Sequence, residues 1–255
     1  MEESRVNVAI SGAAGRMGHI VKETIDAADN MHFAVGFDQK PLENSIYDVC
    51  ESFNYQGMVD VVIDFSHPSA LQNLLKFCLE KKVPVVIATT GLNSEHMIMI
   101  EEASKEIPIL QSSNMSLGVA ILKSLVKQAA KSLAPRGFDI EILEKHHRRK
   151  KDAPSGTAIS IAKEIQSVLP ERYEFINDRN AVEGPRGKNE IGMPVIRGGS
   201  IVGEHEVFFC GEDEIIAISH EALSPKIFAL GAVMAANYLL TVPPGIYSIE
   251  NALGL

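Results

Sequence analysis

The residues best suited to chemistry stand in one basic run, from Glu144 to Ala158 (EKHHRRKKDAPSGTA). The run holds five Lys or Arg and two His, His146 and His147, between two carboxylates. Because the whole chain carries a formal net charge of −9, such a concentration of cations predicts a site for a small, multiply negative ligand. Imidazoles donate protons near neutral pH, and a lysine joins them where burial or neighbouring cations lower its pKa. The run therefore predicts proton transfer to a bound anion.

The same run ends in residues that suit anion binding. Ser155, Gly156 and Thr157 open a predicted helix, and the N–H groups and hydroxyls at a helix N-terminus bind carboxylates or phosphates. A reductase of an anionic substrate needs both an acid and such a cradle. The alternative is a solvated loop or a nucleic-acid patch. Nucleic acid is disfavoured because no aromatic residues interleave the charges and the rest of the chain is acidic.

A second set of residues forms a glycine-rich turn between a predicted strand and a predicted helix: Gly12, Ala13, Ala14, Gly15, Arg16, Met17 and Gly18. Glycines there permit a tight turn and let the backbone approach a pyrophosphate at the helix N-terminus. Asp38 ends the next predicted strand, about twenty residues further on, where a carboxylate accepts the ribose hydroxyls of a dinucleotide. The alternative is an ordinary strand–helix turn with an incidental surface Asp. Arg16 and Lys40 could accommodate the 2′-phosphate of NADP, so the choice between NADH and NADPH stays open.

Two clusters of small polar residues end later strands. The first consists of Ala88, Thr89, Thr90 and Gly91, and the second of Ser112, Ser113, Asn114 and Met115. In an open α/β sheet, ligands bind outside the carboxyl ends of the strands. Both clusters are therefore candidates to line the ribose and nicotinamide pocket, and ordinary strand-ending turns are the alternative.

Short apolar runs alternate with amphipathic helical stretches in the first half of the chain. Strands are predicted at residues 6–11, 33–37, 59–65, 83–90 and 107–112, and helices at residues 18–28, 70–81 and 94–104. Strands that are apolar on both faces and alternate with helices predict a parallel sheet with helices on each side. The predicted fold class is α/β, with an N-terminal Rossmann-type parallel sheet.

After about residue 114 the pattern changes. We predict helices at 117–132 and 157–168, a half-buried strand at 138–143, a long polar loop at 173–189, and paired strands within 194–222 with turns at Gly198-Gly199 and Gly211-Glu212-Asp213. A final helix at 225–240 is expected to pack on the first half. The second domain is thus α+β, with a mixed or antiparallel sheet. We expect residues 1–115, completed by 226–255, to bind the dinucleotide, and residues 116–225 to serve substrate binding and oligomerisation.

Composition excludes several classes of protein. Hydrophobic residues are 45% and charged residues 22%, which is typical of a soluble globular chain and not of a disordered one. Cys50, Cys78 and Cys210 are few, odd in number and far apart, and no His/Cys group has metal-ligand spacing, so we expect neither a disulfide framework nor a metal. Residues 227–242 form the longest mostly apolar stretch and are short for a membrane span. We expect a reduced, cytoplasmic protein without a leader segment, which binds neither nucleic acid nor membrane.

The basic run, with its pattern E-x-H-H-x-x-K-x-D-A-P-S-G-T-A, resembles the signature of the dihydrodipicolinate reductase family. The resemblance extends over nearly the whole chain, through GAAGRMG at 12–18, ATTG at 88–91, SSNMSLG at 112–118 and IVGEH at 201–205. It implies NAD(P)H-dependent reduction of 4-hydroxy-tetrahydrodipicolinate, a small dicarboxylate, to tetrahydrodipicolinate in the diaminopimelate route of lysine biosynthesis. It also implies a homotetramer. Arg149 stands where the family commonly has a histidine, and Gln39 follows Asp38 where some members have an arginine.

Matched by position, the resemblance implies that His146 is the catalytic histidine and Lys150 the proton-donating lysine. His147, Gly156 and Thr157 match residues that bind the dicarboxylate, beside Ser155 of the cradle. Residues 12–17, Asp38, 88–90 and 112–115 match cofactor contacts. We expect the site to lie between the two domains and to close over its substrate.

Two other functions compete with this one. A different two-domain nicotinamide dehydrogenase, acting on an amino-acid semialdehyde or a hydroxy acid, would share the glycine turn but would not need the paired histidines, the lysine and the Ser-Gly-Thr sequence. A redox sensor would bind the dinucleotide without consuming it, and would signal through its second domain. The sequence contains no DNA-binding or partner-binding module of the kind that such a sensor usually carries.

Overall fold

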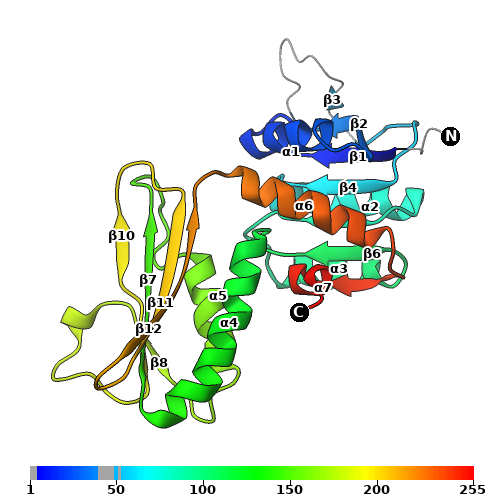
Figure 1. Cartoon of the computed structure of the whole chain (residues 1–255). Coiled ribbons are helices and arrows are strands. Elements are labelled where there is room, and N and C mark those ends of the chain that lie inside the picture. Colours follow the sequence, from blue (N-terminus) through cyan, green and yellow to red (C-terminus); the bar gives the residue numbers. More distant parts are fainter. Residues whose placement is uncertain (1–4, 40–48, 51–52) are drawn as a thin grey trace. The chain divides into compact units, whose positions relative to one another are not determined.

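A computed structural model describes residues 5–39, 49–50 and 53–255 of the chain (Figure 1). The chain divides into two compact units, Met1–Leu117 with Pro225–Leu255, and Gly118–Ser224. The carboxyl-terminal residues therefore belong to the same unit as the amino-terminal ones.

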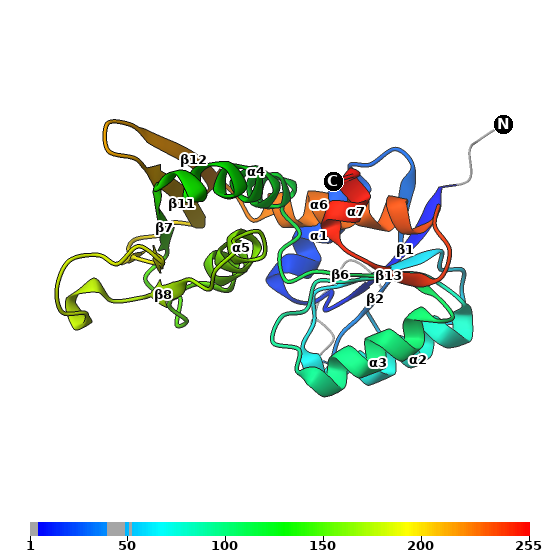
Figure 2. The same ribbon diagram turned by 90° about the horizontal axis from the view of Figure 1, so that it is seen from below.

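The first unit is a parallel sheet with helices on both faces. Its strands are β1 (Val6–Ser11), β2 (Met31–Phe37), β3 (Val49–Cys50), β4 (Val61–Asp64), β5 (Val85–Ile87), β6 (Pro108–Gln111) and β13 (Gly245–Tyr247). Its helices are α1 (Arg16–Asp26), α2 (Leu71–Lys81), α3 (Ser94–Ser104), α6 (Lys226–Leu239) and α7 (Ile249–Leu253). The strands lie in the order β13-β6-β5-β4-β1-β2-β3, and all of these neighbours are parallel. Figure 2 shows α2 and α3 on one face of the sheet and α1, α6 and α7 on the other.

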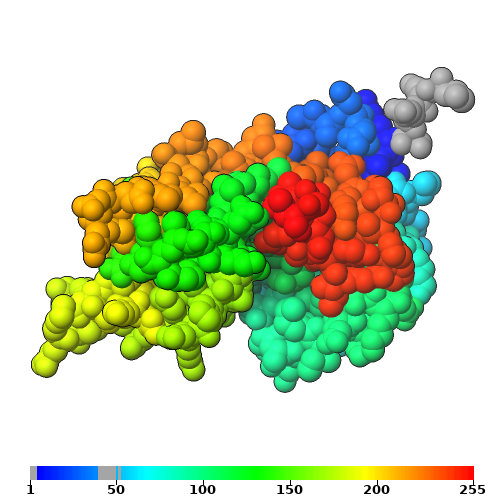
Figure 3. Space-filling model, turned by 60° about the horizontal axis from the view of Figure 1, so that its bottom comes forward, coloured from blue at the N-terminus to red at the C-terminus, as the bar shows by residue number. Residues whose placement is uncertain are grey.

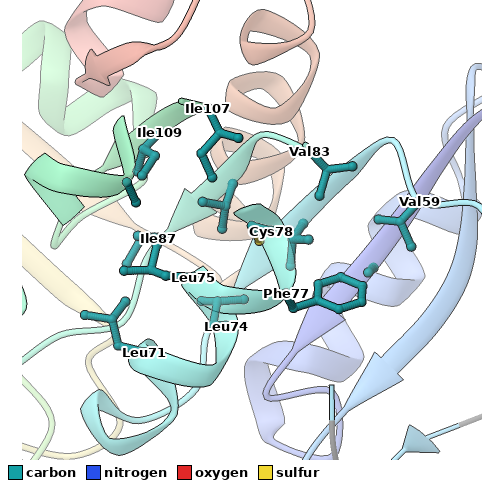
Figure 4. Close-up of a cluster of buried hydrophobic side chains, with 14 of the residues drawn as sticks. Val59, Leu71, Leu74, Leu75, Phe77, Cys78, Val83, Ile87, Ile107 and Ile109 are labelled. Carbon is teal, nitrogen blue, oxygen red and sulfur yellow. The ribbon is translucent and has the colours of Figure 1, made fainter. Parts of the chain in front are cut away.

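Burial on both faces explains why this sheet is parallel and apolar. All residues of β4 are buried, and so are those of β1 from Val8 to Ser11. Parallel strands covered by helices on both faces carry such continuous apolar runs. On one face, Leu74, Phe77 and Cys78 of α2 belong to a cluster of buried side chains that lies against the strands (Figure 4). The predicted Rossmann-type parallel sheet is confirmed.

The second unit is a mixed sheet with two helices. Its strands are β7 (Asp139–His146), β8 (Glu174–Ile176), β9 (Glu190–Gly192), β10 (Val195–Arg197), β11 (Gly203–Cys210) and β12 (Ile215–Ala222), and its helices are α4 (Leu117–Leu133) and α5 (Gly156–Gln166). The order is β12-β11-β7-β9-β8, with β10 also paired to β7. β11 runs antiparallel to β7 and β12, whereas β9 and β10 run parallel to β7. The sheet is therefore mixed, as predicted.

One face of β7 faces the core of the second unit. Its residues alternate strictly between half-buried and buried, so that Ile140, Ile142, Glu144 and His146 share the buried face. Ile140 and Ile142 belong to an apolar cluster with residues of α4, α5, β9 and β11. On this buried face, the apolar Ile140 and Ile142 are therefore followed by two polar side chains, Glu144 and His146.

Two details of the second half differ from the prediction. Residues 173–189, predicted as a loop, contain the short strand β8 and a turn of 3-10 helix, Arg179–Ala181. With three residues, β8 is too short to show a clear alternation in the sequence. Gly198-Gly199 does not join paired strands, because β10 pairs with β7 and not with β11. The turn at 211–213 does join a hairpin, between β11 and β12.

Helix α6 packs against α1 and the central strands of the first unit. Its Gly231 lies against the end of the segment that follows β6, where a Cβ would be 1.7 Å from Met115 O. Figure 3 shows the carboxyl-terminal segment, drawn in red, on the surface of this unit beside α6. Over the described residues, no helix combines the length and the apolar character that crossing a membrane requires.

The close approach at Gly231 leads to a stability prediction. We expect Gly231→Ala to destabilise the protein by about 3 kcal/mol, because the added methyl group overlaps a backbone carbonyl that cannot move without shifting the segment after β6. Gly156→Ala is the control, since a Cβ at Gly156 meets nothing within 4 Å and Ala is the better helix former. Urea denaturation measures both variants. Equal stabilities would contradict this account of α6.

Candidate functional site

The glycine turn lies between β1 and α1, and its backbone is held against the end of β2. Gly12 has a φ of +81°, and a Cβ there would lie 2.5 Å from Phe65 O, so both conformation and space require glycine. The N–H groups of Gly12 and Ala13 donate to Phe37 O at 2.8 and 3.2 Å. A Cβ on Gly18 would lie 2.3 Å from Gly12 O, so this third glycine lets α1 pack closely on the turn.

Asp38 lies directly after β2, as predicted, and it also holds the turn in place. Its Oδ2 accepts the Ala14 N–H at 3.0 Å. Helix α1 begins at Arg16 after an extended Gly15, and no side chain caps it. The N–H groups of a first helical turn have no partner within the helix and carry the positive end of its dipole. This end of α1 is therefore suited to a phosphate.

A cavity of about 580 Å³ opens beside the turn. Its lining includes residues at the carboxyl ends of β1, β2 and β4 and on α2: Gly12, Gly15, Phe37, Asp38, Ser66, His67, Asn73, Lys76 and Phe77. A volume of this size is typical of small-molecule sites. The glycines and Asp38 were predicted from the sequence, whereas Ser66 and His67 were not singled out. The rule that ligands bind at strand ends, applied to β4 as well, would have found them.

Behind the cavity, a buried carboxylate joins the ends of two strands. Asp64, the last residue of β4, accepts hydrogen bonds from Ser66 Oγ at 2.5 Å and Thr89 Oγ1 at 2.6 Å. Burial raises the pKa of Asp64, although the hydrogen bonds from Ser66, Thr89 and Ser11 act to lower it. Thr89, predicted to contact the cofactor, is thus buried and bonded to Asp64. Its neighbours Thr90 and Gly91 are the exposed members of the cluster.

The segment after β6 is a turn held by its own side chains. Ser112 Oγ donates to Asn114 O at 2.8 Å, and the Ser116 N–H donates to Asn114 Oδ1 at 2.9 Å. Ser113 is exposed, and Met115 is buried. The segment lies at the same sheet edge as the glycine turn, because β6 is parallel to β1 through β5 and β4.

The second unit gathers a separate group of polar side chains at the end of β7. His146 is the last residue of that strand, and its Nδ1 lies 2.6 Å from Glu144 Oε2. Glu144 is 0% exposed. Arg197 of β10 donates to both of its oxygens, at 2.8 and 2.7 Å, and the Ser155 N–H donates to Oε1 at 2.9 Å. Burial alone would raise the pKa of Glu144, but the hydrogen bonds from His146, Arg197 and Ser155 outweigh it and hold the pKa at about 2.

A further histidine, His205 of β11, lies edge-on to His146 with 5.2 Å between the ring centroids. His205 Nε2 is 3.0 Å from Ser155 Oγ, the oxygen that accepts the Ala158 N–H and caps α5. Burial lowers the pKa of His205 to about 3, and the neighbouring His146 acts in the same direction. His205 is therefore neutral at pH 7 and packs beside His146 without a second positive charge.

The turn that follows β7 carries the rest of the basic run. Lys150 is half-buried, with Nζ 3.0 Å from Asp152 Oδ2. Burial opposes ionisation of Asp152, but the hydrogen bond from Lys150 gives it a lowered pKa. His147 Nδ1 is buried and has no hydrogen-bond partner among the residues that the structure describes. Arg148, Arg149 and Lys151 are exposed.

The predicted residues fall into two groups, one in each unit. The nucleotide candidates (12–17, Asp38, 88–90 and 112–115) lie at one edge of the first sheet. The substrate candidates lie around the end of β7 and the start of α5: His146, His147, Lys150, Ser155, Gly156 and Thr157. Lys40 lies outside the described residues. Within the described part of the chain, no group of three or more His, Cys, Asp or Glu is arranged to hold a metal ion.

Both parts of the chain match models of one known family. Residues 6–115 match the family model described as dihydrodipicolinate reductase, N-terminus, and residues 118–253 match dihydrodipicolinate reductase, C-terminus. The chain belongs to the dihydrodipicolinate reductase family.

Several members of the dihydrodipicolinate reductase family are similar over their whole length. A relative from Caldanaerobacter subterraneus subsp. tengcongensis, named 4-hydroxy-tetrahydrodipicolinate reductase, is 48% identical over 248 residues, which are 96% of this chain and 97% of the relative. A relative of the same name from Clostridium tetani is 42% identical over 249 residues, or 97% of each chain. Among solved structures, the dipicolinate-bound dihydrodipicolinate reductase from Paenisporosarcina sp. TG-14 is 24% identical, with a TM-score of 0.76, over 97% of this chain and 99% of that one. It has the same fold.

The residues that surround His146 in this member of the dihydrodipicolinate reductase family were not predicted from the sequence. Arg197 was not singled out at all, and Glu144 and His205 appeared only as parts of quoted motifs. The strand was predicted to end at residue 143. Continuing its alternation by one step would have placed Glu144 on the buried face, and a buried carboxylate requires a cationic partner.

The buried groups predict loss of stability in acid. His205 has a pKa of about 3 in the folded protein against an ordinary value of 6.5, so the unfolded chain takes up a proton first as the pH falls from 6.5 to 3. Glu144 adds to this loss below pH 4.5, its ordinary value, since its folded pKa is about 2. We expect the unfolding free energy to fall by up to about 1.4 kcal/mol per pH unit for each such group.

We expect His205→Gln to flatten the slope between pH 6.5 and 3. Glutamine keeps a hydrogen-bonding group near Ser155 but cannot take up the proton. The measurement is amide hydrogen exchange in β11 as a function of pH, corrected for the intrinsic exchange rate. His32→Gln, at an exposed position of β2, is the control and should leave the slope unchanged. An unchanged slope in His205→Gln would refute the assignment.

Proposed function

We propose that this protein is a 4-hydroxy-tetrahydrodipicolinate reductase of the diaminopimelate route to lysine. It converts 4-hydroxy-tetrahydrodipicolinate to tetrahydrodipicolinate with NADH or NADPH, consuming one proton and releasing one water. The observation that carries the proposal is the cluster at the end of β7, in which His146 and a cationic turn stand beside the start of α5. Relatives that bear this name are 48% and 42% identical over nearly the whole chain.

The first unit is proposed to hold the dinucleotide. Three features together fit a pyrophosphate with its ribose. They are the missing side chains of Gly12 and Gly15, the uncapped start of α1, and the cavity beside Asp38. Residues 12–17, Asp38, 88–90 and 112–115 are the proposed contacts, and Thr89 is in addition bonded to Asp64. When bound, the dinucleotide supplies a hydride from nicotinamide C4 to the substrate ring.

The second unit is proposed to hold the dicarboxylate and supply protons. Ser155, Gly156 and Thr157 present the start of α5 to one carboxylate, and the space over Gly156 is open, since a Cβ there meets no atom within 4 Å. His147 precedes this end of the helix in the sequence, and its ring nitrogen is proposed as a further contact to the dicarboxylate. Lys150 and His146 supply or relay the proton with which the departing hydroxyl leaves as water. The dipicolinate bound to the Paenisporosarcina enzyme is also a dicarboxylate.

We further propose that the protein is a cytoplasmic homotetramer. Support comes from β12, an edge strand of the second sheet whose Ile215 is 65% exposed. An apolar edge strand of this kind is usually covered by another chain or by charged residues.

The test of the function is nucleotide oxidation by the purified protein, with the substrate generated in place by a dihydrodipicolinate synthase. We expect rapid oxidation that depends on the synthase product and is absent when the synthase is left out. The ratio of rates with NADH and NADPH then gives the cofactor preference. Tight nucleotide binding without oxidation would reject the reductase and favour a sensor.

The role of Lys150 predicts a specific kinetic defect. Lys150→Ala should lower kcat by about 10²-fold or more, since general acid catalysis contributes at least that much, and should leave nucleotide affinity nearly unchanged. Lys151→Ala removes the exposed neighbouring cation and is the matched control, with near-normal kcat. Isothermal titration with NADH and steady-state kinetics measure the two quantities. Loss of nucleotide binding in Lys150→Ala would contradict the assigned role.

A further inference from the structure

We propose that Glu144, clamped by Arg197, is the positioning residue of His146: it fixes the proton on Nδ1 and directs Nε2 to the substrate. The inference rests on the proposed function, in which His146 acts at the dicarboxylate. It assigns roles to two residues that belong to neither the predicted catalytic pair nor the predicted anion cradle.

The hydrogen bonds around Glu144 determine which nitrogen of His146 carries the proton. Oε1 accepts the Ser155 N–H and one terminal N–H of Arg197, and Oε2 accepts the other terminal N–H of Arg197. A carboxyl group that accepts a guanidinium at both oxygens is ionised and has no proton to donate. The 2.6 Å contact between Oε2 and His146 Nδ1 is therefore a hydrogen bond donated by Nδ1–H. In the neutral ring, the lone pair is then on Nε2.

The residues around the His146 ring leave its Nε2 available to hydrogen-bond a bound substrate. His146 Nε2 has no hydrogen-bond partner among the described residues and lies close to Gly203 of β11, where a Cβ would be 3.0 Å away. The ring of His205 stands edge-on at 5.2 Å. Turning the His146 ring over would place a C–H group against the ionised carboxylate and lose a charge-assisted hydrogen bond. The ring is thus held in one orientation, with 9% of the residue exposed.

Arg197 connects this histidine to the turn that carries Lys150. The nitrogen that binds Glu144 Oε1 also donates to Asp152 O at 2.8 Å, and the Asp152 carboxylate pairs with Lys150. One guanidinium therefore binds both Glu144, which contacts His146, and the backbone of Asp152, whose carboxylate pairs with Lys150. Planar recognition of this kind requires Arg, because Lys offers a single point of charge.

The substitution Glu144→Gln should reverse the tautomer. The amide oxygen of the new side chain would keep the Ser155 N–H and one Arg197 N–H, which places the amide NH₂ opposite His146 Nδ1. Nδ1 must then accept, so the proton of the neutral ring moves to Nε2. A ring with Nε2–H cannot take up a proton at that nitrogen, and the relay to substrate is broken.

The first measurement is long-range ¹H–¹⁵N NMR of the histidine rings, without substrate. In the wild-type protein we expect neutral His146 to show Nδ1–H and an unprotonated Nε2, and in Glu144→Gln the reverse. Comparison with a His146→Asn spectrum assigns the signal among the eight histidines. A wild-type ring with its proton on Nε2 would overturn the proposal. Because no turnover is involved, this result does not depend on the proposed function. The proposed function is rejected separately, if the wild-type protein has no reductase activity.

The second measurement is kinetic and separates positioning from simple structural support. We expect Glu144→Gln to lower kcat by about 10²-fold and to change KM for the nucleotide by less than about threefold. Glu204→Gln, which removes a carboxylate paired with Lys145 on the adjacent strand, is the matched control and should retain kcat. Normal kcat in Glu144→Gln would reject the role.

Arg197 provides a second test that does not depend on the folding of Glu144→Gln. Arg197→Lys keeps the positive charge but replaces at most one of the two contacts to Glu144, so we expect kcat to fall about tenfold with the Nδ1–H tautomer retained. Arg197→Met removes the charge and should lower kcat further. Equal kcat in the wild type and both variants would show that the clamp does not position His146.

Discussion

The second unit depends on the burial of one ionised carboxylate. Glu144 is fully buried, and an ionised group there is stable only if its oxygens are fully hydrogen-bonded and a counter-charge is at hand. Its partners come from three elements: Arg197 from β10, the Ser155 N–H from the start of α5, and His146 from β7 itself. These hydrogen bonds draw the start of α5 and the end of β10 to the end of β7. The same requirement that stabilises the charge therefore assembles the site.

The first unit meets a different constraint, which is close approach of the backbone. In a parallel sheet with helices on both faces, the strands are too well covered to bind a ligand, and binding falls to the loops at their carboxyl ends. Gly18 lacks the Cβ atom that would separate α1 from the turn after β1, and Gly12 lacks the one that would meet the backbone of Phe65 after β4. Asp64 bonds the loops after β4 and β5 to each other. A buried acid thus holds the loops that are proposed to bind ligands in each unit, through hydroxyl donors in the first and through a guanidinium in the second.

Much of the fold and part of the site could be predicted from the sequence. Apolar runs of residues 6–11 and 59–65 have the period and flanks of buried strands, and the glycine turn with Asp38 is a local pattern. The basic run identified His146 and Lys150 because charge and order are visible in one dimension. Arg197 was not predictable in this way, since it reaches Glu144 across 53 residues of sequence and only by a parallel pairing of β10 with β7. The hydrogen bond from Thr89 to Asp64 was not predictable for a similar reason, because the two residues stand 25 positions apart in the sequence.

The charges of the second site explain why the buried rings of two histidines can lie side by side. Arg197 and Glu144 cancel each other, and burial keeps His205 neutral, with its pKa lowered to about 3. A proton arriving on His146 then adds a single positive charge beside an anion, whereas two charged imidazoles 5.2 Å apart would repel each other. Ser155 completes the arrangement, because one residue caps α5, contacts His205 through Oγ and donates its N–H to Glu144. The helix end proposed to hold the substrate and the carboxylate that orients the histidine are therefore fixed by the same residue, so that anion binding and proton transfer share one rigid support.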